Sequence, residues 1–426
     1  MSDKGTSVQD DGSKDLSYES SQDAVAEIDL DAPSAQICSG FALISDGYQN
    51  NLMIMTNVLL RKKYPVYFTS PVSTRVSNAL LIGEIFGQVT IGLTCDYLGR
   101  KFAIIVTTAM IVIGGILATA SNGDSVLAAC KYSHLGTVWR VCFGIGCVPP
   151  LTVFYFRLKM LNSKLYRRGA IKKRVPYSLV GSYYWKSLIG TCGAWFLYDF
   201  ITFPNGVFSG TIIALVVSSS GDNVIMKTGQ WQLLLGAIAL PGVMVGAYLC
   251  DRLGRKNTMM LGFAGYVVFG LIIVCAYDKI TKIVPLFVIF YGLMQSMGNL
   301  GPGDMLGLIS SETYATSVRG TCYGLSAAVG KAGAAIGTQA FTPIQAHLGK
   351  KWAFIIAAIC GVAGMLVTYY FIEDLSGEDL ALRDERFRVY LVERGWEGEM
   401  GEDDLKGVAE NVKVEEVVKS KEAAQS

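Results

Sequence analysis

Charge and histidine are scarce in this chain. Of its 426 residues, 17% are charged and two are histidine, whereas an ordinary soluble chain carries about 25% charged residues. The ten cysteines form no C-x-x-C pair and no group with the spacing of metal ligands. No nucleophile elbow and no phosphate-cradling loop occur either. The sequence therefore predicts no enzyme, no metal site and no cofactor. A net charge of +2 indicates no nucleic-acid partner.

Long apolar runs take the place of these features. Hydrophobic residues make up 51% of the chain, and a bilayer core of about 30 Å needs about 20 largely apolar residues per helix. Only Pro204-Asn205-Gly206 separates two of the runs, so we expect these two to form one long, broken helix. The sequence thus predicts an all-α polytopic membrane protein with about ten transmembrane helices, at residues 38–60, 76–95, 102–121, 138–156, 186–219, 228–250, 257–277, 283–309, 320–342 and 352–372.

Polar segments flank and divide these runs. Residues 1–36 are acidic and rich in serine, and residues 373–426 are charged, which indicates two solvated tails. A short amphipathic helix is expected at about residues 380–392. The segments between the tails are predicted to be an N-terminal transmembrane half at 37–156, a basic loop at 157–184 and a C-terminal transmembrane half at 185–372.

Basic residues set the expected orientation, because loops rich in Lys and Arg stay in the cytoplasm. The loop at 157–184 is the most basic of the loops, so it and both termini are predicted to be cytoplasmic. The cluster Arg61-Lys62-Lys63 argues for the opposite orientation but carries less charge.

An internal repeat relates the two halves. Residues 96–101 read Asp-Tyr-Leu-Gly-Arg-Lys, residues 251–256 read Asp-Arg-Leu-Gly-Arg-Lys, and each copy lies between two apolar runs. The glycine lets the chain reverse, and the basic residues suit the lipid headgroups. The aspartate is expected to lie against a helix N-terminus of its own half.

A few ionisable residues interrupt the apolar runs. An ionised side chain at membrane depth costs about 2.5–3.5 kcal/mol or more, so Asp46, Asp199 and Lys331 are functional candidates. A buried cation can hold an anion, and carboxylates beside it can exchange protons. These three residues could instead form neutralising ion pairs without transport. Glu84 is a further candidate, although it could equally be a buried acid that makes an interhelical hydrogen bond.

The repeated loop, with Gly92 four residues before Asp96, resembles the signature loop of the major facilitator superfamily. Residues 310–331 resemble the region of helices ten and eleven in fungal phosphate:proton symporters. Three further segments resemble the fungal glycerophosphoinositol and glycerophosphocholine permeases of that group: residues 43–51, 198–206 and 301–305.

This resemblance implies a major facilitator fold and a set of site residues. Asp46 and Asp199 would couple protons. Phe203 and Asp304 stand where phosphate carriers have tyrosine and asparagine, which suits a substrate larger than phosphate. The residues expected to bind substrate are Trp195, Tyr198, Asp199, Phe203, Asp304 and Lys331; the residues expected to serve the conformational switch are Asp96, Arg100, Asp251, Arg255, Glu312 and Arg319, with Glu312 and Arg319 as a pair.

The resemblance implies a proton-coupled symporter that imports glycerophosphodiesters through the plasma membrane. An inorganic phosphate:proton symporter is the close alternative. The chain departs from the family between Asp96 and Asp251, where six spans are expected and four are found. By this count we expect helices four and five of the family to be missing at residues 122–137. A shortened family member that does not transport is therefore a third interpretation.

Overall fold

A computed structural model describes much of the chain, and all regular elements within the described residues are helices. Several predicted segments lie largely or wholly outside the described residues: the first and fourth spans, most of the basic loop, residues 122–137, and both tails apart from 373–374 and 380–396. The described residues are 52–53, 56–57, 60, 64, 66–97, 100–120, 144–146, 148, 151, 175–216, 224–374 and 380–396.

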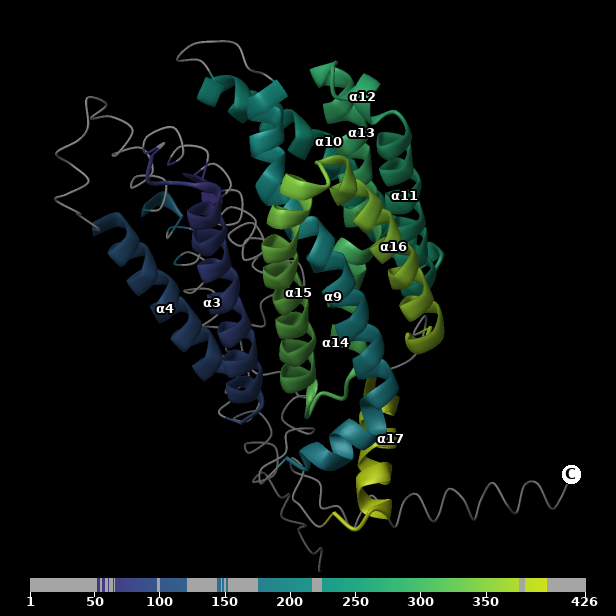
Figure 1. Ribbon diagram of the computed structural model, residues 1–426. Coiled ribbons are helices and arrows are strands. Elements are labelled where there is room, and N and C mark those ends of the chain that lie inside the picture. The colour runs from purple at the N-terminus through teal and green to yellow at the C-terminus, as the bar shows by residue number, and fades with distance from the viewer. Residues whose placement is uncertain are drawn as a thin grey trace, which may run out of the picture.

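The helices form one bundle in which their axes run roughly side by side (Figure 1). By length and composition alone, four described helices could cross a membrane, over residues 71–96, 229–252, 255–275 and 351–371. The elements are α3 (Ser70–Tyr97), α4 (Arg100–Ala120), α9 (Tyr177–Val216), α10 (Val224–Arg252), α11 (Arg255–Cys275), α12 (Tyr277–Ile280), α13 (Val284–Gly298), the π-helix η1 (Asn299–Gly303), α14 (Asp304–Thr313), α15 (Arg319–His347), α16 (Lys351–Phe371) and α17 (Leu380–Glu393).

The two short runs around Pro204 belong to a single element, as predicted, but the expected break in the helix is absent. α9 has 40 residues and continues through Pro204, so it is about 60 Å long at 1.5 Å per residue. That length is about twice the hydrocarbon core of a bilayer. The predicted span at 283–309 is instead interrupted by η1, which carries Pro302 and places Asp304 at the first position of α14.

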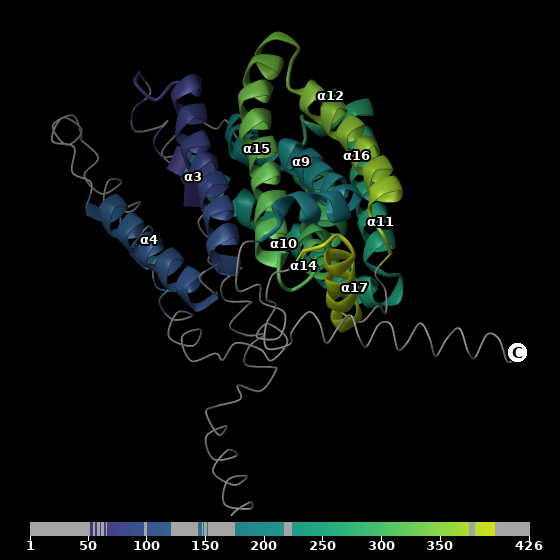
Figure 2. The same cartoon turned by 90° about the horizontal axis from the view of Figure 1, so that it is seen from below.

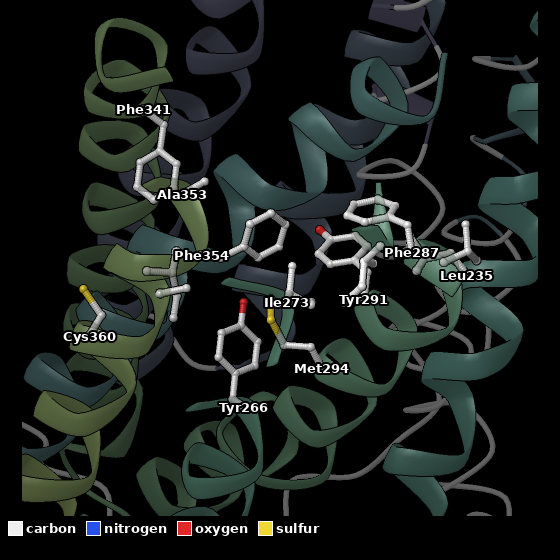
Figure 3. Packing of buried hydrophobic residues seen from close by; sticks show 14 residues of the cluster. Leu235, Tyr266, Ile273, Phe287, Tyr291, Met294, Phe341, Ala353, Phe354 and Cys360 are labelled. Atoms are coloured by element: carbon white, nitrogen blue, oxygen red, sulfur yellow. The ribbon is translucent and has the colours of Figure 1, made fainter. Parts of the chain in front are cut away.

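Aromatic packing holds the C-terminal helices together (Figure 3). The rings of Phe287 and Tyr291 on α13 stack with centroids 5.6 Å apart. Phe354 of α16 meets both of them edge-on, and Tyr266 of α11 is fully buried in the same cluster. Edge-to-face pairs of this kind add about 0.5–1.5 kcal/mol beyond the area that they bury.

The N-terminal half joins this bundle along an antiparallel contact between α3 and α15, here called the α3–α15 seam (Figure 2). At one end, the hydroxyl oxygens of Thr74 and Thr342 lie 3.2 Å apart. Near the other end, a Cβ atom on Gly324 would lie 2.6 Å from the carbonyl oxygen of Gln88. Small residues let helix backbones approach this closely.

The amphipathic helix expected in the C-terminal tail is confirmed as α17, and it packs against the bundle below the start of α9 (Figure 1). Phe387 and Leu391 are fully buried against Tyr184 and other aromatic residues. Arg383 Nη1 donates to the carbonyl oxygen of Thr313 at 3.0 Å. The backbone amide of Thr316 donates to Asp384 Oδ1 at 2.6 Å. α17 therefore holds the segment that joins α14 to α15.

Replacing Phe387 by alanine is expected to destabilise this end of the bundle by about 3–5 kcal/mol, because it removes a fully buried aromatic side chain. Thermal unfolding of the purified full chain in detergent measures the change. Leu382→Ala is the matched control, since Leu382 lies on the same helix and is 44% exposed. Equal losses of stability in the two variants would contradict the packing of α17 described above.

Candidate functional site

The candidate site is centred on Lys331, halfway along α15. Its Nζ atom lies 3.3 Å from Glu84 Oε2 of α3 and 3.8 Å from Asp199 Oδ2 of α9. The same atom lies 4.1 Å from the ring centroid of Phe203. The three charged side chains are 15%, 19% and 6% exposed, in the order Lys331, Glu84, Asp199. One buried cation is thus held between carboxylates from both halves of the molecule.

Helical spacing explains how α9 contributes to this site. Residues Trp195, Asp199 and Phe203 are four apart, so they share one face of α9. Gly330 of α15 leaves room for the ring of Trp195, since a Cβ atom at Gly330 would collide with it. The ring of Trp195 also meets Tyr323 edge-on at 5.6 Å. A glycine next to Lys331 therefore lets α9 approach closely enough for Asp199 to reach the cation.

The charges of the site do not balance within the described residues. With both carboxylates ionised, Lys331, Glu84 and Asp199 carry a formal net charge of −1. Buried charges are stable only when they are paired and hydrogen-bonded. An anion that enters can pair with Lys331, but it must replace a carboxylate or be accompanied by a proton.

Tyr198 lies on a different flank of α9, and Asp304 is the first residue of α14. The hydroxyl of Tyr198 lies 3.2 Å and 3.1 Å from the positions that Cβ atoms on Gly298 and Gly303 would take. Asp304 Oδ2 is buried without a hydrogen-bond partner in the described part of the chain. The structure thus brings together four of the six predicted substrate residues at Lys331. It places Tyr198 and Asp304 beside η1.

The signature aspartate Asp96 has a partner in the other half that the sequence did not predict. The carboxylate of Asp96 accepts hydrogen bonds from the start of α15, which belongs to the other half. The backbone amides of Gly320 and Thr321 donate to it at 3.1 Å and 2.6 Å. A carboxylate at a helix N-terminus satisfies free amides and complements the helix dipole. Asp96 therefore ties the two halves together at this end of the seam.

Its counterpart in the second repeat behaves differently. The Asp251 side chain is 77% exposed, and its ion pair is with Arg255 at 3.6 Å. Glu312 has a different partner from the one expected, because it accepts hydrogen bonds from Arg255 Nε at 3.1 Å and Nη2 at 3.3 Å. Arg319 Nε donates to the carbonyl oxygen of Tyr314 at 3.1 Å.

Two predicted residues are not tested in this way. Asp46 lies outside the described residues, and Arg100 is placed only as the first residue of α4. Their roles in proton coupling and in the conformational switch stay predictions.

A buried hydroxyl network supports the same end of the bundle. The hydroxyl oxygens of Thr191 on α9 and Tyr314 lie 2.7 Å apart, and Thr191 also lies 2.9 Å from Ser326 Oγ on α15. Burial raises the pKa of the Tyr314 phenol well above its ordinary value. The phenol therefore stays neutral and can donate or accept within this network.

Sequence reasoning undervalued Glu84. It treated Glu84 as a secondary candidate without a partner, yet the structure pairs it with Lys331 more closely than Asp199. The signal was present, because an acid between Gly83 and Gly87 in the middle of an apolar run has no water to solvate it. What the sequence could not supply was the register of α3 against α15.

Known protein families and relatives match most of this chain. The family described as "Sugar (and other) transporter" matches residues 32–147 and 169–387. Glycerophosphoinositol permease 1 of Candida albicans is 48% identical over 455 aligned positions, which cover 90% of this chain and 88% of that protein. Glycerophosphoinositol transporter 1 of Saccharomyces cerevisiae is 45% identical over 451 positions, covering 89% of this chain and 87% of the transporter.

Among solved structures, the proton:xylose symporter XylE bound to 6-bromo-6-deoxy-D-glucose superposes with a TM-score of 0.61. It is 14% identical and covers 83% of this chain and 99% of that chain, so this likeness concerns the fold alone. The chain is therefore a membrane transporter of the major facilitator fold and belongs to the sugar (and other) transporter family.

Proposed function

We propose that this chain is a proton-coupled symporter that imports a glycerophosphodiester, such as glycerophosphoinositol or glycerophosphocholine, through the plasma membrane. The observation that carries this proposal is Lys331, a buried cation held between Glu84 of one half and Asp199 of the other. Two relatives that are 48% and 45% identical are named for glycerophosphoinositol. Transporters commonly place substrate and ion sites between their repeats near the middle of the membrane.

The chemistry of the site suits a phosphodiester. The phosphate of such a substrate carries one negative charge and would pair with Lys331, while Trp195 and Phe203 provide aromatic surface around it. Tyr198 and Asp304 would serve the hydroxyl groups of the inositol or glycerol moiety, since a carboxylate accepts hydrogen bonds from hydroxyls. A bilayer and protons are the other expected partners, with Asp46 and Asp199 as proton acceptors.

Alternating access would require the two halves to separate at the end that carries Asp96. This end is proposed to face the cytoplasm together with both termini. The residues that we assign to this switch are Asp96, which caps α15, the ion pair of Arg255 and Glu312, and also Arg100, Asp251 and Arg319.

A shortened, non-transporting family member is the second candidate, and two observations favour it. The alignment with the Candida permease has 455 positions, more than the 426 residues of this chain. Part of that relative therefore has no counterpart in this chain. In addition, Asp251 is 77% exposed, whereas Asp96 of the first repeat caps a helix of the other half. An N-terminal half that lacks helices four and five would offer Asp251 no helix to cap.

Uptake measurements separate these candidates. A yeast strain without glycerophosphodiester permeases is made to express the full chain and is given labelled glycerophosphoinositol at several pH values. We expect saturable uptake that is faster at acidic pH and is reduced by unlabelled glycerophosphodiesters. Uptake at background with normal amounts of protein in the membrane would support the non-transporting candidate. Equal competition by inorganic phosphate would support a phosphate symporter.

A further inference from the structure

The carboxylate of Glu84 has no assigned role in the transport scheme above. Its Oε2 atom lies 3.3 Å from Lys331 Nζ, closer than the 3.8 Å of Asp199 Oδ2. Lys331 and Asp199 both come from the C-terminal half, on α15 and α9, while Glu84 comes from α3. Among the described residues, Glu84 is thus the acid of the N-terminal half that neutralises the cation of the candidate site.

The surroundings of Lys331 leave few directions for a substrate. A lysine ammonium group has three donors, and here Glu84, Asp199 and the face of Phe203 lie around it. A phosphate oxygen that reaches Nζ must therefore take the place of one of these groups. Glu84 is the one that can leave most easily, because its side chain is 19% exposed against 6% for Asp199 and because it belongs to the half that moves relative to Lys331.

Charge balance links this exchange to a proton. Lys331 with two ionised carboxylates carries a formal charge of −1, and a phosphodiester anion would make it −2 in a buried site. A proton taken up by Glu84 returns the charge of the loaded site to −1. Glu84 pairs with Lys331 on α15, and the same lysine is approached by Asp199 on α9. α4, which also packs on α3, has its charged residues Arg100 and Lys101 at its first turn.

We propose that Glu84 is the proton-binding carboxyl that the phosphodiester displaces from Lys331. A proton from the side of substrate entry binds a Glu84 carboxylate oxygen, the ion pair between Glu84 and Lys331 breaks, and a phosphate oxygen forms a new ion pair with Nζ. After the substrate leaves, Glu84 loses the proton to the opposite side and pairs with Lys331 again. The restored pair links the two halves in the empty carrier. This proposal rests on the proposed function, and it identifies a group that couples the flux of protons to the flux of the glycerophosphodiester.

Binding of labelled glycerophosphoinositol to the purified full chain at pH 5.5 and pH 7.5 tests the proposal. We expect the wild type to bind about tenfold more tightly at pH 5.5, within the range of about 5- to 150-fold typical of coupled sites. Glu84→Gln mimics the protonated acid, so it should bind equally well at both pH values, with the affinity of the wild type at pH 5.5. Glu84→Asp should retain the dependence on pH.

Transport by the same variants gives a second measurement. The Glu84→Gln variant should still exchange internal for external substrate. Its accumulation of substrate against a concentration gradient should be at least about tenfold lower than that of the wild type. Thr74→Val is the matched control, because it removes a hydrogen bond of the same seam without changing a charge, and it should keep the pH dependence of the wild type.

Several outcomes would overturn the proposal. In the first, Glu84→Gln shows the same pH dependence of substrate binding as the wild type. In the second, it binds no substrate at either pH. In the third, Thr74→Val loses its pH dependence as Glu84→Gln does. Each of these leaves the proposed function standing. A wild type that neither binds nor transports glycerophosphoinositol at any pH overturns the proposed function together with this proposal.

Discussion

Replacing Lys331 by glutamine is expected to reduce glycerophosphodiester uptake by at least about 30-fold. The loss of one partner from a buried, hydrogen-bonded charge pair costs about 2–5 kcal/mol, and Lys331 is the cation that Glu84 and Asp199 share. The substrate anion would meet two carboxylates without the charge that neutralises them. Initial rates of labelled uptake in a permease-null strain, divided by the amount of protein in the membrane, measure the effect. Lys279→Gln is the control, because Lys279 is an exposed lysine on α12.

A double-mutant cycle separates loss of binding from loss of folding. Lys331→Gln leaves Glu84 and Asp199 facing each other without their cation, which should lower thermal stability by about 3–5 kcal/mol. Adding Glu84→Gln removes one of the two like charges, so the double variant should recover stability but not uptake. If the double variant recovers uptake as well, Lys331 does not bind the substrate. Uptake at the wild-type rate by the Lys331→Gln single variant would also show that Lys331 does not bind the substrate.

The positions of helices could be predicted from the sequence to a large extent, because apolar runs of about 20 residues have few alternatives in a membrane. The merging of two short runs into α9 was predicted, since the three residues between them are too few to form a loop that leaves and re-enters the membrane. The π-turn at η1 was not, because the same Gly-Pro-Gly sequence can also end or kink a helix. The packing of α17 was missed too, since Phe387 and Leu391 show a pattern but not its partner.

The candidate site was only partly predictable. The sequence contains the spacing that puts Trp195, Asp199 and Phe203 on one face of α9, since that depends on the 3.6-residue period alone. Contacts between helices depend on their register, which no local pattern records. For this reason the partner of Glu84 was not identified, and Asp96 was assigned to a helix of its own half.

Register also explains why the α3–α15 seam is sensitive to single side chains. A Cβ atom at Gly92 of α3 would lie 2.7 Å from the carbonyl oxygen of Gly320 and 3.2 Å from the Cα atom of Gly324. Both neighbours are backbone atoms of α15, which cannot move aside as a side chain could. Gly87, five residues earlier on the same helix, has no atom within 4 Å of its Cβ position.

Gly92→Leu and Gly87→Leu are therefore expected to have opposite outcomes. Leucine at position 92 must push α3 away from α15 and break the two hydrogen bonds from Gly320 and Thr321 to Asp96. Overpacking of this kind costs about 1–3 kcal/mol, and loss of a helix cap costs about 0.5–2 kcal/mol more. Leucine at position 87 meets open space and is a better helix former than glycine by up to about 1 kcal/mol.

Crosslinking and thermal unfolding measure these outcomes together. A pair of cysteines introduced at Thr74 and Thr342, whose hydroxyl oxygens are 3.2 Å apart, reports closure at the far end of the seam. Cysteines at Gln88 and Thr321 would report closure near Asp96. Gly92→Leu should lower the melting temperature and the crosslinking yield near Asp96 while leaving the Thr74 pair less affected, because the collision is local to that end. Equal behaviour of Gly92→Leu and Gly87→Leu in both measurements would show that α3 and α15 do not approach each other at Gly92, and the cap that joins the halves through Asp96 would then have to be abandoned.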